Sequence, residues 1–310
     1  MVKQYPKIST SQLFCILLLS RLSAEIVYPN TVSAVASQTV LAVVISELVR
    51  FLIALPLIIY SFNGSNIHRA VYNKNKFFGW AGAIFAALLL FAAALRTMFD
   101  LSQFAVKNLI PGGVMWLLFA LAAAFAVYSA VAGVEALARS GAVFLIVTAI
   151  VTLAVMLADI PYINRASFES LVISGDNSTL FGNITERVMR GGDYLIFAAL
   201  LPYVSRNRKS ELGRVAVLFA VFSMLAVLLI TVMNCLILRE MYGQTEFPFL
   251  AAASLSDISL FKRLDGFAAA VWSLCAAFRS GVMLLAAECA LVEVYKAGIS
   301  SKNEKGETAQ

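Results

Sequence analysis

Long apolar runs constrain this chain more than any other feature. Stretches such as LFCILLL, ALLLFAAAL and LAVLLITVM lie inside apolar segments of about 20 residues or more, the length of helix needed to cross a hydrocarbon core of about 30 Å. Because lipid offers no partners for backbone N–H and C=O groups, only helices and closed barrels span it. These runs lack the alternating pattern of barrel strands. The sequence therefore predicts an all-α membrane bundle.

Composition agrees with this class and excludes others. The chain is 61% hydrophobic and 14% charged, whereas soluble domains are about half apolar and about a quarter charged. Its net charge of +6 comes from basic residues scattered among short loops, so the sequence indicates no nucleic-acid partner. The four cysteines lie within apolar runs without metal-like spacing, which predicts ordinary buried thiols.

The apolar runs predict about eight transmembrane helices. They cover about residues 9–28, 32–61, 77–106, 112–133, 135–159, 194–205, 213–238 and 263–296. The charged stretch SRLSAEIVYPN is expected to interrupt the first helix, and the sixth is too short to span alone. Loops 160–192 and 239–262 are each expected to hold a short helix lying at the membrane interface. Residues 1–297 form one predicted transmembrane domain, and 298–310 a disordered cytoplasmic tail.

The distribution of Lys and Arg predicts the orientation. With the N-terminus inside, thirteen basic residues fall in cytoplasmic segments and seven in outer segments. Cytoplasmic loops of membrane proteins carry the excess of positive charge. Both termini are therefore predicted to be cytoplasmic.

The sequence carries no recognisable catalytic set. His68 is the single histidine and lies in a basic loop, and there is neither a glycine-rich phosphate loop nor a Cys/His cluster. We therefore predict a protein that is not an enzyme and has no catalytic residues, no cofactor and no metal site.

Charges at membrane depth are the remaining functional candidates. A charge near the bilayer centre costs at least about 2.5 kcal/mol on insertion scales, so such residues are normally paired, turned inward or in contact with water. Glu47 with Arg50, and Glu135 with Arg139, are spaced i,i+3 and i,i+4. Both pairs appear close to helix ends, where mutual neutralisation is the simpler interpretation.

Two sites favour a functional role more strongly. Arg21 and Glu25 lie in the first helix shortly before Pro29, where an interrupted helix would offer backbone groups to a polar ligand. We expect Arg21 to face the bundle interior beside Glu25 or an acid of another helix. Arg279 has no acid within four residues, so its partner must come from another helix or from a solute.

Several segments, taken in order, resemble one known family. They are KISTSQLFCILLL, LRTMFDLSQF, GVEALARSG, FPFL and FKRLDGFAAAVWSLCAAFRSGVMLL, and together they extend over about residues 7–296. This set resembles the B subunit of Ger-type spore germinant receptors, also described as spore germination permeases, in the amino acid, polyamine and organocation carrier superfamily. The resemblance implies a subunit of the spore inner membrane that senses a small nutrient, commonly an amino acid, alongside an A subunit and a lipoprotein C subunit.

The resemblance also implies a ligand site between the first, third, sixth and eighth helices. For Arg96 and Asp100 in the third helix, a structural role and a binding role are equally supported by the residues alone. Together with the charges described above, the implied ligand-binding residues are Arg21, Leu22, Ser23, Ala24, Glu25, Arg96, Asp100, Leu201, Pro202, Tyr203, Trp272 and Arg279.

The chain departs from the family pattern in two ways. Family members usually carry Gly-x-Gly in the first helix, where this chain has Leu22 and Ala24, so ligand binding would use side-chain charge or would be absent. Members also have ten helices in LeuT-like inverted repeats, and the expected architecture here lacks the last two. A secondary amino acid transporter of the same fold and a degenerate, non-binding structural subunit therefore remain alternative interpretations.

Overall fold

The computed structural model describes most of the chain as helix. The described residues are 7–31, 35–62, 71–72, 74–163, 177–205, 211–255 and 264–307. Within them, seven helices are long and apolar enough to cross a membrane. These are α1 (Thr10–Val27), α2 (Ala36–Phe62), α4 (Lys76–Asn108), α5 (Met115–Ala132), α6 (Val134–Asp159), α10 (Glu211–Leu238) and α12 (Leu264–Glu307). The predicted all-α polytopic bundle is confirmed.

Shorter helices complete the described fold. They are α8 (Asn177–Met189), α9 (Asp193–Leu200), α11 (Pro248–Leu255) and the 3-10 turns η1 (Ile160–Tyr162), η2 (Leu201–Tyr203) and η3 (Arg239–Gln244). The predicted sixth helix corresponds to α9, whose eight residues end in the turn that contains Pro202. A proline cannot donate a backbone hydrogen bond, which explains why the regular helix does not continue.

The first helix corrects the sequence analysis. α1 is continuous from Thr10 to Val27, whereas the charged stretch was predicted to interrupt it. Leu22 and Ala24 are good helix formers, and the charged side chains find partners on other helices, so nothing forces the backbone open. The helix begins at a capping box in which Ser9 Oγ accepts from Gln12 N at 3.2 Å and Gln12 accepts from Ser9 N at 2.9 Å.

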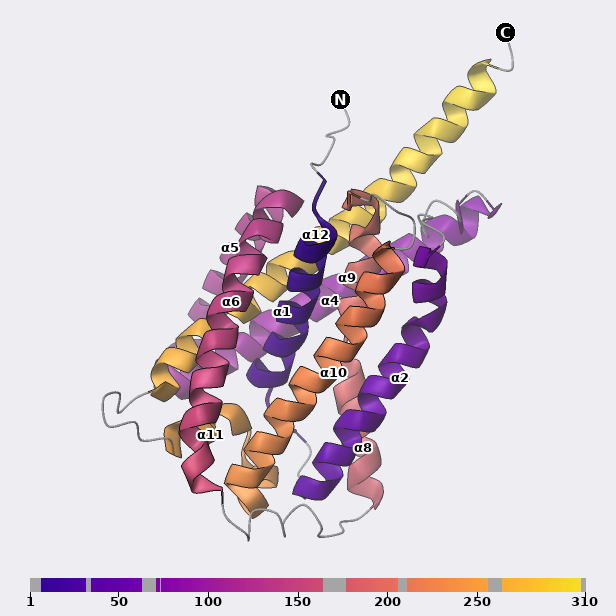
Figure 1. The fold of residues 1–310 in the computed structure, drawn as a ribbon. Helices are drawn as coiled ribbons and strands as arrows, with labels where there is room; N and C mark the ends of the chain where they lie inside the picture. Colours follow the sequence, from indigo (N-terminus) through magenta and orange to yellow (C-terminus); the bar gives the residue numbers. More distant parts are fainter. Residues whose placement is uncertain are drawn as a thin grey trace.

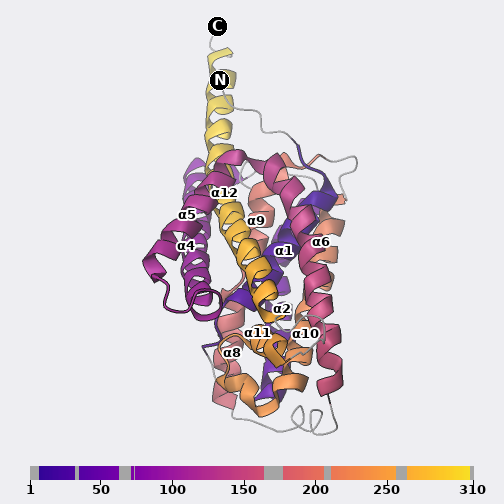
Figure 2. The same cartoon turned by 90° about the vertical axis from the view of Figure 1, so that its left-hand side faces the viewer.

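Helix α12 is the axis of the bundle. Figure 2 shows it between α4 and α5 on one side and α1 and α6 on the other. It contributes much of the core, including Trp272 and Phe278, with Phe278 packed edge-on against Phe144 at 5.7 Å between ring centroids. At 1.5 Å per residue its 44 residues extend about 66 Å. It therefore projects beyond the other helices, as Figure 1 shows.

The C-terminal part of α12 extends into the tail predicted to be disordered from residue 298, and that disorder stays a prediction. The helix continues to Glu307 without a break. Extending a formed helix needs no new nucleus, which favours continuation into polar sequence. The start of α1 and the end of α12 lie at the same end of the bundle, here called the terminal end, and the opposite end is called the far end (Figure 1).

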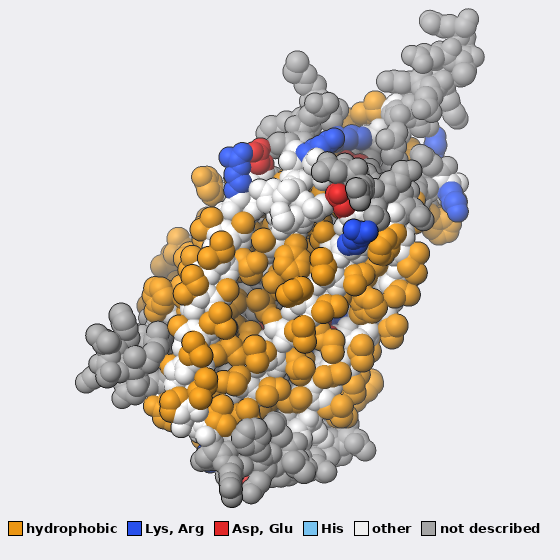
Figure 3. Space-filling view, viewed as in Figure 1, with side chains coloured by type: hydrophobic (Ala, Val, Ile, Leu, Met, Phe, Trp, Pro, Cys, Tyr) orange, Lys and Arg blue, Asp and Glu red, His pale blue; other side chains and the backbone are white. Residues whose placement is uncertain are grey.

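The surface has the character expected in a bilayer. The face in Figure 3 is covered by hydrophobic side chains through its middle, with Lys, Arg, Asp and Glu gathered near the terminal end. Helices α4, α5 and α6 expose Phe85, Trp116 and Ile150, each more than half accessible. An apolar belt of this kind is typical of a surface that faces lipid.

Two short helices were predicted at the membrane interface, and both pack against longer helices of the bundle. α8 lies alongside α2 (Figure 1), and Thr179 Oγ1 donates to Gln38 Oε1 of α2 at 2.7 Å. α11 is largely buried, with Phe249 packed against Trp272. Both segments are helical as predicted. Each packs against longer helices, and their position at the membrane interface stays a prediction.

Gly281 allows α12 and α5 to approach closely. A Cβ atom added there would lie 2.6 Å from Ser129 Cβ, whereas Gly82 on α4 has nothing within 4 Å. We expect Gly281→Val to lower the free energy of unfolding by about 1–3 kcal/mol through overpacking. Gly82→Val is the matched control, because it makes the same change of helix propensity without a clash. Thermal unfolding of the purified variants measures the difference, and equal melting temperatures would contradict the close contact.

Candidate functional site

Seven charged side chains form a continuous series of ion pairs through the middle of the bundle, here called the ionic chain. Arginines and acids alternate along it, and no member's side chain is more than 5% exposed. It connects α8, α1, α2, α9 and α12. In order, its members are Arg187, Glu25, Arg21, Glu47, Arg50, Asp193 and Arg279.

The α1 members lie as predicted. Arg21 is 1% exposed, its Nε lies 3.0 Å from Glu47 Oε1, and its Nη2 lies 3.3 Å from Glu25 Oε2 one turn along the helix. Glu25 also accepts a hydrogen bond from Arg187 of α8. The predicted inward position of Arg21, with Glu25 and an acid of another helix as neighbours, is confirmed.

Glu47 and Arg50 belong to this centre, which corrects their assignment to a helix end. α2 spans Ala36–Phe62, so both lie near its middle. Arg50 Nη1 is 2.8 Å from Glu47, and its Nη2 is 2.8 Å from Asp193 Oδ2. The two residues do neutralise each other, but each also bonds a side chain of another helix. The predicted range of 32–61 already placed both residues near the middle of the helix, so the assignment to a helix end was wrong.

Asp193, like Arg187, is a site residue that the sequence analysis missed. It opens α9 directly after Gly191 and Gly192 and is 0% exposed. Its Oδ1 accepts from Arg279 Nη1 at 3.0 Å and from Ser20 Oγ at 2.8 Å. The sequence held one clue to this residue. Arg279 has no acid within four residues, so its partner had to come from elsewhere in the membrane.

Close packing explains Gly191, which lies two residues before Asp193. A Cβ atom at Gly191 would lie 2.6 Å from Arg50 Nε. Glycine here allows the guanidinium of Arg50 to pass the backbone and reach the Asp193 carboxylate. Gly191 thus leaves room for Arg50 to reach the acid.

Arg190 lies between α8 and α9 and bonds the end of α1. Its Nη2 donates to Pro29 O at 2.9 Å and pairs with Glu186. Its own carbonyl accepts from Arg279 Nη2 at 3.0 Å. Burial raises the pKa of the Glu186 carboxyl, but the Arg190 guanidinium outweighs this and holds the pKa below its usual value.

Tyr28 connects α4, the third helix of the sequence analysis, to the ionic chain. Its ring lies 5.5 Å from the Arg96 guanidinium and 5.7 Å from that of Arg279, distances typical of cation–π contacts. Tyr28 Oη and Thr97 Oγ1 are hydrogen bonded at 2.7 Å. Arg96 itself is largely exposed, whereas Asp100 is buried and lies 3.5 Å from Arg96 Nε.

The other predicted site residues are not members of the ionic chain. Tyr203 packs near the terminal end, where Lys296 Nζ lies 5.5 Å from its ring and its carbonyl accepts from Ile8 N. Trp272 packs on Phe249 toward the far end. Leu201, Pro202, Leu22 and Ala24 make no ion pair in the described structure, and Ser23 Oγ donates to Ser20 O of its own helix.

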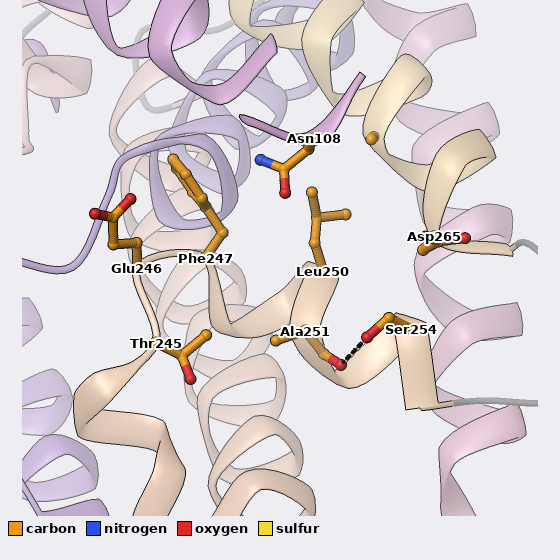
Figure 4. Close-up of a pocket in the computed structure, with 9 residues that line it drawn as sticks. Asn108, Thr245, Glu246, Phe247, Leu250, Ala251, Ser254 and Asp265 are labelled. Atoms are coloured by element: carbon orange, nitrogen blue, oxygen red, sulfur yellow. Dashed lines mark hydrogen bonds between the residues drawn. The ribbon is translucent and has the colours of Figure 1, made fainter. Parts of the chain in front are cut away.

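A separate pocket of about 250 Å³ opens at the far end between α4, α11 and α12. Its floor is apolar, with Phe247 and Leu250. Figure 4 shows Glu246 and Asp265 on opposite sides of it, and Glu246 is already paired with Lys107. Its polar groups do not converge on one point, so the ionic chain is the better-built site.

The chemistry of the centre is that of buried, mutually paired charges. Among the described residues, no group of three or more His, Cys, Asp or Glu is placed to hold a metal ion. Buried guanidinium and carboxylate groups supply strong, directional hydrogen bonds to ionic ligands.

Comparison with known proteins identifies the family. No curated protein matches the chain. The model of the spore permease family, described as spore germination protein, matches residues 7–302. This match covers nearly the whole chain and confirms the resemblance found in the sequence. The chain is therefore an integral membrane protein that belongs to the family of spore germination proteins.

Proposed function

We propose that this protein is the membrane subunit of a spore germinant receptor that senses a small nutrient, an amino acid, and helps to trigger germination. Family membership supports the role in germination. The observation that carries the sensing role is the ionic chain, because buried charges in membrane-spanning helices are expensive and characteristically functional. The protein would act as a receptor subunit and not as an enzyme.

The proposed mechanism rests on the ion pairs that connect the helices. The ionic chain joins α1, α2, α9 and α12, so a ligand with its own charges would compete with bonds that hold these helices together. Binding would thereby shift the balance between two helix arrangements. An A subunit and a lipoprotein C subunit in the spore inner membrane would respond to that shift, with both termini of this chain in the cytoplasm.

Germination of deletion spores tests the receptor role. In a strain lacking other receptor genes of this type, spores without this gene are expected to lose their response to at least one amino acid of a full panel. Restoring the wild-type gene should restore it, and release of spore-core contents with time is the measurement. Unchanged responses to every amino acid would overturn the proposal.

Transport is the second candidate, favoured by one feature. α9 is short and gives way to the 3-10 turn Leu201–Tyr203, as discontinuous helices do in carriers that bind solutes near the bilayer midplane. Uptake of radiolabelled amino acids into proteoliposomes separates the two functions. Concentrative uptake would assign a carrier, and binding without uptake would assign a receptor.

A further inference from the structure

Positive charge exceeds negative charge in the ionic chain. Its seven members are four guanidinium groups and three carboxylates, so one positive charge is left over. The two ion pairs beside it, Arg190 with Glu186 and Arg96 with Asp100, are each neutral. The ionic chain and these two pairs are here called the charged centre. Since an uncompensated charge in a low-dielectric interior is strongly unfavourable, the charged centre favours one additional anion.

The unpaired donors of the charged centre lie at one end of the ionic chain. Among its described residues, the buried guanidinium nitrogens without an acceptor are Arg190 Nε, Arg190 Nη1 and Arg279 Nε. The side chains of Arg190 and Arg279 are only 2% and 1% exposed. By contrast, all three guanidinium nitrogens of Arg21 and of Arg187 have acceptors. Leaving buried charged donors unpaired is costly, so the free N–H groups indicate where the anion belongs.

Three guanidinium groups lie against Tyr28 and Pro29. The Cζ atoms of Arg96 on α4 and Arg279 on α12 are 5.5 and 5.7 Å from the centroid of the Tyr28 ring. Arg190 Nη2 donates to Pro29 O at 2.9 Å, and the Arg190 carbonyl accepts from Arg279 Nη2 at 3.0 Å. Three positive charges are therefore gathered around two consecutive residues. Like charges at this separation repel each other, and an anion among them would offset that repulsion.

We propose that a monovalent inorganic anion such as chloride binds between Arg190 and Arg279, beside Tyr28. The free N–H groups of the two arginines donate to it, and its single charge balances the excess of the ionic chain. Hydrogen bonds from a guanidinium to an anion are among the strongest in proteins. A monatomic anion needs only the room of a water molecule, about 30 Å³. The anion is a fixed part of the charged centre, separate from the nutrient of the proposed receptor function.

Thermal unfolding of the full-length protein in lipid nanodiscs tests this site. Sodium chloride is replaced stepwise by sodium gluconate, whose organic anion is far larger, at constant ionic strength. When chloride reaches about ten times its dissociation constant, the melting temperature is expected to lie about 2–4 °C above its value in gluconate alone. Bromide should replace chloride. A wild-type melting temperature that is the same in chloride and in gluconate would overturn the proposal.

Asn30→Asp supplies the compensating charge from the protein itself. Asn30 Oδ1 lies 3.4 Å from Arg190 Nη2, and aspartate has nearly the same shape as asparagine. This variant is expected to melt at the same temperature in chloride and in gluconate, because its own carboxylate balances the excess charge.

The matched control is Asn75→Asp. Asn75 is the exposed N-cap of α4, a position where aspartate caps as well as asparagine does. This variant should keep the full chloride response of the wild type. If Asn30→Asp keeps that response too, the stabilisation is a general effect of salt and the anion site is wrong.

Binding of radiolabelled chloride provides a direct measurement on the wild-type protein, independent of how any variant folds. Saturable binding of a single chloride per protein molecule is expected, with competition by bromide and none by gluconate. Binding no greater than that of empty nanodiscs would overturn the site. These experiments contain no amino acid, so a failure of the anion site leaves the receptor proposal standing.

Discussion

Asp193→Asn is expected to prevent stable accumulation of the protein in the membrane. The Asp193 carboxylate is fully buried between Arg50 and Arg279. Removing one partner of a buried ion pair costs about 3–5 kcal/mol, because the remaining charge is uncompensated. Here Arg279 loses the acid of its ion pair and Arg50 keeps only Glu47, and a protein's whole stability is commonly about 5–15 kcal/mol. Quantification of membrane-inserted protein, and its melting temperature in detergent, measure the effect.

Two further variants make this result interpretable. Glu135→Gln breaks an exposed ion pair with Arg139 and should cost no more than about 1 kcal/mol. Adding Arg279→Leu to Asp193→Asn removes one of the stranded cations, so accumulation should partly recover. If Asp193→Asn accumulates as well as Glu135→Gln does, the ionic chain does not hold the bundle together.

The double variant Arg21→Leu with Glu47→Leu is expected to fold but to lose the nutrient response. It removes one cation and one anion that pair with each other, so the net buried charge does not change. Apolar residues of similar volume often replace a buried ion pair at little cost in stability. The ionic link from α1 to α2 would nevertheless be gone, and with it the linkage between the ligand and α2. Thermal unfolding and spore germination are measured side by side.

The single variant provides the contrast. Glu47→Leu alone removes one carboxylate from both Arg21 and Arg50 and leaves an excess buried positive charge, so this variant should unfold at a clearly lower temperature than the double variant. A double variant that germinates normally on every amino acid would show that this pair serves folding alone.

The fold was largely predictable because its signal is local. An apolar run of membrane-spanning length specifies a helix without reference to the rest of the chain, which is why the boundaries of α1, α4 and α6 agree with the sequence analysis within a few residues. The eight-residue α9 was recognised as too short by the same reasoning.

The site was less predictable because its partners are not local. The sequence showed that Arg279 needed an acid, but only the packing of α9 against α12 identifies that acid as Asp193. The same limitation applies to Glu25, whose main partner Arg187 is far along the chain. The predicted interruption of α1 failed for this reason, since the partners of its charges determine whether its backbone stays helical.

The short backbone pairing at the terminal end has a mechanical consequence. Ile8 N donates to Tyr203 O at 2.9 Å, and Ser205 N donates to Ile8 O at 2.8 Å, on either side of a parallel bridge to Val204. About 18 Å further along α1, Ser20 bonds Asp193 at the start of α9. A helix held by contacts at two separated points cannot rotate about either one. α1 and α9 are therefore held together as one rigid unit. Any rearrangement that keeps both contacts must move this unit relative to the helices around it.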